Sequence, residues 1–198
     1  MNIGLDDNWN LEVDVMFGMR RMDFKGNENI HHRNESRAGL GDTRIILRHL
    51  VSNVTVGPGK RTFLGYGLVV PSKNIVEKNP FDYEGDITYD DSAHTHFDLS
   101  EGVYKFLGEV QYFKRGESSL LFGGVGNVEI PITPNKYGYL PGSQLNTAIM
   151  AYLQSKRFFQ GMPLFTILGQ YRTSDYWNGE KAPNSGGVVV QLGTGLVW

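Results

Sequence analysis

The sequence predicts an all-β protein, an up-and-down antiparallel transmembrane β-barrel with about eight strands visible, in a single domain over residues 1–198. Three observations predict this fold. Apolar and polar residues alternate over most of the segments, with the period of a β-strand. The connections between the segments are alternately long and short, as in up-and-down membrane barrels. The chain also contains 25 Gly and 8 Pro, which are too many for a helical bundle.

The first predicted strand begins at Trp9, where apolar and polar side chains alternate over much of the segment. A helix would distribute Glu12, Val13 and Asp14 around its circumference, whereas a strand places them on two faces. The apolar face carries Trp9, Leu11, Val13, Val15, Phe17 and Met19. The polar face carries Asn10, Glu12, Asp14 and Arg20.

The next four strands are predicted at residues 39–51, 61–74, 96–113 and 118–130. The first three of these again have two distinct faces. Their apolar positions are Thr43, Ile45, Leu47, Leu64, Tyr66, Leu68, Val70, Tyr104, Phe106, Val110 and Tyr112. The opposite positions are Asp42, Arg44, Arg48, Gly65, Gly67, Glu101, Lys105, Glu109 and Gln111.

The last three strands are predicted at residues 143–154, 162–174 and 187–198. Residues 143–154 are rich in helix formers, but their alternation and their neighbours favour a strand. The long connections are residues 25–38, 73–95, 131–142 and 174–186, and the short ones are 54–61, 114–117 and 155–161. This rhythm predicts an even strand count with both termini on the side of the short turns.

Composition excludes several classes of protein. With 19 Lys and Arg against 21 Asp and Glu, the formal net charge is −2, so no nucleic-acid partner is expected. The absence of Cys removes disulfides, thiolate metal sites and cysteine nucleophiles. No apolar stretch approaches the roughly 18 residues of a membrane helix. Residues 1–8 show no signal peptide, which taken literally indicates the cytoplasm; a processed or partial chain is the alternative.

The orientation of the two faces decides between a membrane barrel and a soluble one. In a membrane barrel the apolar face meets lipid and the polar face lines the interior, whereas a lipocalin-like barrel has an apolar cavity. Aromatic residues near the ends of the apolar faces and charges of both signs on the polar faces favour the membrane barrel. The candidate lumen-lining residues are Glu12, Asp14, Arg20, Asp42, Arg44, Arg48, Glu101, Lys105 and Glu109.

Catalytic or metal-dependent chemistry has little support. The glycines around Tyr66 and at 123–126 are not followed by the helix that a phosphate-binding loop requires. His94 and His96, with the aspartates near them, could bind a metal, but their spacing matches no known motif. The chain has no Gly-x-Ser-x-Gly elbow, and Glu12 and Asp14 are better explained by ion pairs with Arg44 and Arg48. We therefore expect no enzyme activity, no cofactor and no metal site.

Three segments carry a resemblance to a known family. These are GLGD followed by RIILRHLV, then FLGYGLVVPSKN, then HFDLSEGVYKFLGEVQYF. Over about residues 9–125 the chain resembles the porin-like outer-membrane transporter barrels associated with meta-pathway phenol degradation. The aromatic C-terminus, Trp198, resembles the assembly signal of outer-membrane proteins. The resemblance implies a bacterial outer-membrane location, passage or binding of small molecules, and more than eight strands, so that this chain would form part of a larger barrel.

Three functional hypotheses follow. The first is a porin-like or transporter-like barrel, with the lipid bilayer and small-molecule solutes as partners. The second is a filled eight-stranded barrel with a structural or surface-interaction role, because eight strands leave an interior that side chains can fill. The third is a soluble lipocalin-like barrel that binds an apolar ligand. The oligomeric state stays open.

Overall fold

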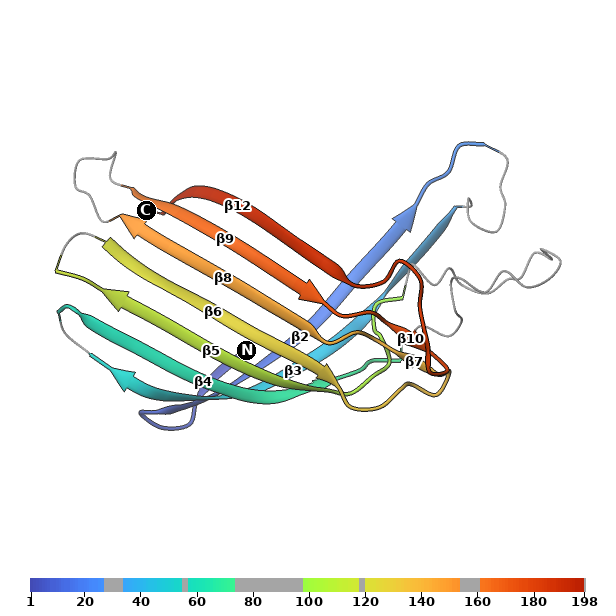
Figure 1. Ribbon diagram of the computed structural model, residues 1–198, viewed down its shortest axis with the longest axis horizontal. Helices are drawn as coiled ribbons and strands as arrows, with labels where there is room; N and C mark the ends of the chain where they lie inside the picture. The colour runs from blue at the N-terminus through green and yellow to red at the C-terminus, as the bar shows by residue number, and fades with distance from the viewer. Residues whose placement is uncertain (27–33, 55–56, 74–97, 118–119, 154–160, 198) are drawn as a thin grey trace.

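In the computed structural model, the described residues (1–26, 34–54, 57–73, 98–117, 120–153 and 161–197) form two antiparallel sheets and no helix. The larger sheet has nine strands in the order β1-β2-β3-β4-β5-β6-β8-β9-β12 (Figure 1). The smaller sheet has three strands in the order β11-β10-β7. Within these ranges, no helix has the length and apolar character needed to cross a membrane.

Each strand of the larger sheet pairs with the strand of that sheet that comes next along the chain. The short strands between them in the sequence form the smaller sheet. The larger sheet comprises β1 (Asn2–Gly4), β2 (Trp9–Met22), β3 (Glu35–Asn53), β4 (Gly59–Val70), β5 (Lys105–Arg115), β6 (Leu120–Pro131), β8 (Gln144–Leu153), β9 (Met162–Arg172) and β12 (Gly187–Val197). The smaller sheet comprises β7 (Tyr139–Leu140), β10 (Tyr176–Trp177) and β11 (Glu180–Lys181).

Eight long strands occupy the eight segments that alternation predicted, and residues 144–153 are a strand rather than a helix. The all-β antiparallel fold is therefore confirmed. The closure expected of a barrel is not observed, because β1 and β12 are the two edges of the sheet. β1 pairs with residues 10–12 of β2, and β12 pairs only with β9 among the described strands.

Some predicted boundaries are wrong. β3 begins at Glu35, inside a predicted loop, because it continues to pair with the far end of β2. β5 begins at Lys105, so residues 98–104, which were predicted as strand, do not belong to it, and Gly102 has a φ of 70° that a strand does not allow. β1 also precedes the first predicted strand. Asp6 shapes the turn between β1 and β2 by accepting hydrogen bonds from the backbone N–H groups of Asn8 and Trp9, at 2.7 and 2.8 Å.

The two faces of the larger sheet have opposite chemistry. Residues directly paired across antiparallel strands share a face, so the register places side chains in rows across the sheet. One apolar row contains Val13, Ile45, Leu68, Phe106 and Ile130. The next row along the strands, on the opposite face, contains Glu12, Ile46, Gly67, Leu107, Glu129, Gln144 and Arg172.

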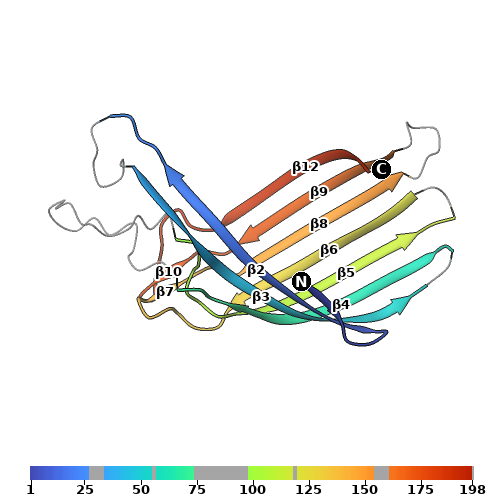
Figure 2. The ribbon, with the colours of Figure 1, turned by 180° about the vertical axis from the view of Figure 1, so that it is seen from behind.

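The larger sheet curls strongly, so that its first strands lie behind the later ones in Figure 1 and in front of them in Figure 2. The polar face is the concave one, because ion pairs join strands that are not neighbours across it. Arg44 of β3, for example, reaches Glu129 of β6. The apolar face is convex and exposed, including Val15, Phe106 and Ile149.

The smaller sheet lies at the end of the larger one that carries the longer connections (Figure 1). Its β10–β11 hairpin turns at Asn178 and Gly179, whose φ angles of 50° and 85° are those of a two-residue hairpin loop. The ring centroids of Tyr139 and Trp177 are 4.8 Å apart, and both rings are buried with Ala182. Residues 131–142 and 174–186, predicted as loops, thus contain a small core of their own.

Candidate functional site: the concave polar face

Arg48 is the centre of the first group of charges on the concave face. Its guanidinium donates to both carboxylate oxygens of Glu109, at 2.6 and 3.1 Å, and to Glu12 at 2.8 Å. Arg48 and Glu109 belong to β3 and β5, on either side of β4. They can meet because Gly65 lies between them in the same row and has no side chain. A Cβ at this glycine would lie 3.1 Å from the Cβ of Glu109.

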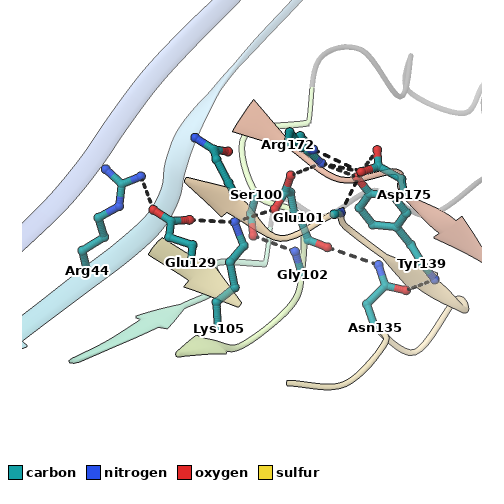
Figure 3. Close-up of polar contacts among 12 residues, drawn as sticks. Arg44, Ser100, Glu101, Gly102, Lys105, Glu129, Asn135, Tyr139, Arg172 and Asp175 are labelled. Carbon is teal, nitrogen blue, oxygen red and sulfur yellow. Dashed lines mark hydrogen bonds and ion pairs between the residues drawn. The ribbon is translucent and has the colours of Figure 1, made fainter. Parts of the chain in front are cut away.

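The second group is a chain of alternating charges that crosses the concave face (Figure 3). Its links are Arg44–Glu129 at 2.6 Å, Glu129–Lys105 at 3.0 Å, Lys105–Glu101 at 2.7 Å, Glu101–Arg172 at 2.8 Å and Arg172–Asp175 at 2.9 Å. Glu129 and Glu101 each use one oxygen for each neighbouring cation. The three cations and three anions balance, which is how charges are held in a protein interior, and all members except Arg44 have low exposure.

Residues 98–104, which we call the strap, connect the two sides of the curled sheet at its long-connection end. Asp98 accepts a hydrogen bond from Arg37 of β3, and Asp98, Leu99, Ser100 and Val103 are buried. The strap then reaches β9 through the ion pair between Glu101 and Arg172. Its fit is close, because a Cβ on the neighbouring Gly41 of β3 would lie 2.7 Å from the carbonyl oxygen of Leu99.

Asp175 fixes the smaller sheet to the larger one. One of its oxygens accepts hydrogen bonds from Arg172 and from the backbone N–H of Gly142, and the other accepts one from the hydroxyl of Tyr139 at 3.1 Å. Burial, together with the nearby carboxylates of Glu101 and Asp175, raises the pKa of Tyr139 well above its usual value. The phenol therefore stays neutral and remains a hydrogen-bond donor at any ordinary pH.

The part of the concave face between β6 and β12 has a different chemistry. Three amide side chains lie in one row and bond to one another: Asn146 donates to Asn127 at 2.9 Å and accepts from Gln170 at 3.0 Å. Gln144 also donates to Asn146, at 2.8 Å. Beside them is a cavity of about 310 Å³ that is also lined by Val125, Ala148, Leu168, Val189 and Gln191.

The structure brings most of the predicted lumen-lining residues together on the concave face. Glu12, Arg48 and Glu109 form the first group, and Arg44, Glu101 and Lys105 belong to the alternating chain. Asp42 lies against the strap, close to Ser100 and Glu101. Asp14 and Arg20 belong to neither group. Asp14 is exposed opposite Arg44 in the register, and Arg20 is exposed opposite Arg37.

The predicted ion pairs of Glu12 and Asp14 with Arg48 and Arg44 are confirmed only for Glu12 and Arg48. Arg44 pairs instead with Glu129, which is not among the predicted lumen-lining residues. Arg172 and Asp175 are not among them either. Two signals were available. Glu129 lies two residues from Asn127 on β6, and Arg172 lies two residues from Gln170 on β9. Each therefore shares a face with a polar amide, which is the position of an inward-facing residue.

Other predicted features lie outside the described residues. These are His94 and His96, with Asp90 and Asp91 near them, and the C-terminal Trp198. Among the residues that the structure does describe, no group of three or more His, Asp or Glu side chains is placed to hold a metal ion.

Comparisons with known proteins give no relative. No family model, no curated protein and no solved structure matches this chain. The chemistry of the two faces of the larger sheet is therefore the basis on which a function can be inferred.

Proposed function

We propose that the chain is a β-barrel protein of the bacterial outer membrane, and that its concave face lines an interior in which small molecules bind or pass. The observation that carries this proposal is the exposure of large apolar side chains on the convex face of every long strand. One example from each strand is exposed: Val15, Ile45, Leu68, Phe106, Ile130, Ile149, Ile167 and Val190.

An apolar face of this extent is unusual for a protein surface in contact with water. Monomeric soluble proteins rarely expose contiguous apolar patches larger than a few hundred Å². A tilted strand crosses the hydrocarbon core of a bilayer with about 9–11 residues, and the eight long strands have between 10 and 19. The lengths and the apolar face together fit a lipid environment.

The concave face supports the same proposal and disfavours a soluble lipocalin-like barrel. A lipocalin-like barrel holds its ligand against apolar side chains inside. Here the concave face carries Arg48, Lys105 and Glu129, each buried and ion-paired, while most of the exposed large apolar side chains of the long strands lie on the convex face. The family resemblance inferred from the sequence implies the same location and role.

Two adjacent substitutions test the proposal. Ile149 and Met150 are neighbours on β8, and Ile149 belongs to the convex face while Met150 belongs to the concave face. A lysine on the lipid side near the bilayer centre costs about 2–4 kcal/mol, whereas a lysine on the lumen side does not. We expect Ile149→Lys to reduce insertion into phospholipid vesicles and Met150→Lys to insert nearly as the unaltered protein does, measured by protection from added protease.

A protein that stays monodisperse without detergent and does not insert into phospholipid vesicles would contradict the proposal. Equal insertion of both lysine variants would also contradict it, because the two faces would then not differ in their surroundings.

A filled, non-conducting barrel with a structural or surface-interaction role is the second candidate. The alternating chain from Arg44 to Asp175 favours it, because this chain and the strap occupy part of the concave face. Planar-bilayer recordings distinguish the two candidates. Stable single-channel steps from the unaltered protein support passage, and their absence supports the filled barrel.

A further inference from the structure

The concave face is divided into a charged part and an uncharged part. Between β2 and β5, most polar side chains in the central rows are ionised and paired. Between β6 and β12, the charged side chains that face inward are Glu129 and Arg172, within the described residues. Both are held in the alternating chain, and each lies two residues along its strand from an amide, Asn127 or Gln170, on the same face. The cavity of about 310 Å³ lies in the uncharged part.

The cavity has unused hydrogen-bonding capacity. An amide side chain offers two donor hydrogens and a carbonyl oxygen. Asn146 uses its oxygen twice, for Gln144 and Gln170, and donates once. The carbonyl oxygen of Gln170 and the whole amide of Gln191 have no hydrogen-bond partner among the described residues. Donors and acceptors therefore face the cavity together.

The rest of the cavity wall is aliphatic. Val125, Ala148, Leu168 and Val189 supply apolar surface beside the amides. Binding sites for small molecules combine such a wall with a few polar groups that fix the orientation of the ligand. A charged ligand would lose its hydration there without meeting an opposite charge, which is unfavourable.

We propose that this cavity binds an uncharged small molecule that carries amide, carbonyl or hydroxyl groups on an aliphatic skeleton. The proposal names a ligand class for the interior of the proposed barrel and so rests on that function. The amides of Asn127, Asn146, Gln170 and Gln191 bond to the polar groups of the ligand, and the aliphatic wall covers its skeleton. The ion pairs of the alternating chain lie next to the site and leave no free charge to recruit an ion.

Three probes that share one skeleton test this proposal. They are cyclohexanecarboxamide, cyclohexanecarboxylate and cyclohexylmethylammonium, which differ in charge but little in size. The full chain is folded in detergent micelles, and binding is measured by calorimetric titration. We expect the amide to bind about tenfold more tightly than either ion, because the ions lose hydration without compensation.

One variant adds a charge to the cavity, and another controls for the change in side chain. Gln191→Glu introduces a carboxylate at a side chain with no partner to lose, so it should weaken binding of the amide and reverse the preference towards the ammonium probe. Asn53→Asp, which adds the same charge at the far end of β3, should leave all three affinities unchanged.

Equal affinity for the three probes, or no saturable binding of the amide, would overturn the proposal. So would a Gln191→Glu variant whose probe preference matches that of the unaltered protein. The vesicle insertion assay separates this result from a failure of the proposed function. A protein that inserts but does not prefer the amide refutes the ligand class alone, and a protein that does not insert refutes the barrel.

Discussion

Replacing Arg48 by methionine should leave two carboxylates without their cation. Arg48 makes three hydrogen bonds to Glu109 and Glu12, and the Glu109 side chain is only 8% exposed. Breaking a buried ion pair by removing one partner costs about 3–5 kcal/mol, because the other charge stays buried. Glu12 is 23% exposed, so water can compensate it in part. We expect Arg48→Met to lower the free energy of unfolding by about 3–5 kcal/mol.

The double variant Arg48→Met with Glu109→Gln shows whether the cause is the unpaired charge. Without the Glu109 charge, what remains is the loss of hydrogen bonds, at about 1–3 kcal/mol, and the partly hydrated charge of Glu12. The double variant should therefore be more stable than Arg48→Met alone. Unfolding by guanidinium chloride in micelles measures both, with tryptophan fluorescence as the signal, since Trp9 stacks on His49 at 4.3 Å beside Arg48.

Arg21→Met is the matched control for this series. Arg21 pairs with Asp23 at 2.9 Å, but both side chains are 64% exposed, and exposed pairs contribute little to stability. If Arg48→Met proves as stable as Arg21→Met, or if adding Glu109→Gln makes it less stable, then the Arg48 group does not act as a buried ion pair.

Three further predictions concern packing, pH and the loop end. Gly67→Ala should lower the unfolding midpoint while Gly126→Ala leaves it unchanged, because a Cβ at Gly67 would lie 1.9 Å from a backbone oxygen of β3 and one at Gly126 meets nothing within 4 Å. Stability should fall as the pH rises above about 10, where an unfolded tyrosine ionises but Tyr139, with its raised pKa, stays neutral. Unfolding curves of Tyr139→Phe should show less of this fall, and an identical fall would refute the assignment. Arg172→Met removes the cation between the strap and the smaller sheet, so limited proteolysis should cut the loop end faster than in Arg21→Met; equal rates would show that the strap is held otherwise.

The sequence predicted the strands and their faces because both depend on local information. A period of two fixes which side chains share a face, whatever the strand pairs with. Alternation alone therefore places Arg48 and its partner Glu109 on the polar face, where the structure has them. Residues 144–153 were assigned as a strand for the same reason, despite their helix propensity.

The contacts across the concave face could not be predicted in this way. Arg44 pairs with Glu129 rather than with Asp14, its direct neighbour in the register, and Glu129 belongs to β6, which two strands separate from β3. Such a pair depends on the curl of the sheet, which the alternation of single strands does not encode. The strap was missed for the opposite reason, because residues 98–104 resemble a strand locally but turn at Gly102 to cross the sheet.

The position of the glycines explains why the charged and uncharged parts of the concave face stay separate. On β4, Gly65 and Gly67 leave the centre of the face open, so long side chains from β3 extend over it to β5 and β6. On β8 and β9 the inward positions beside the cavity carry Asn146, Ala148, Leu168 and Gln170, none of which is charged. Charges can therefore be paired over β4, whereas the inward charges nearest to the cavity, Glu129 and Arg172, are already paired in the alternating chain. An ionised residue placed in the second region would lack a partner within reach, which accounts for the amides found there in the same rows.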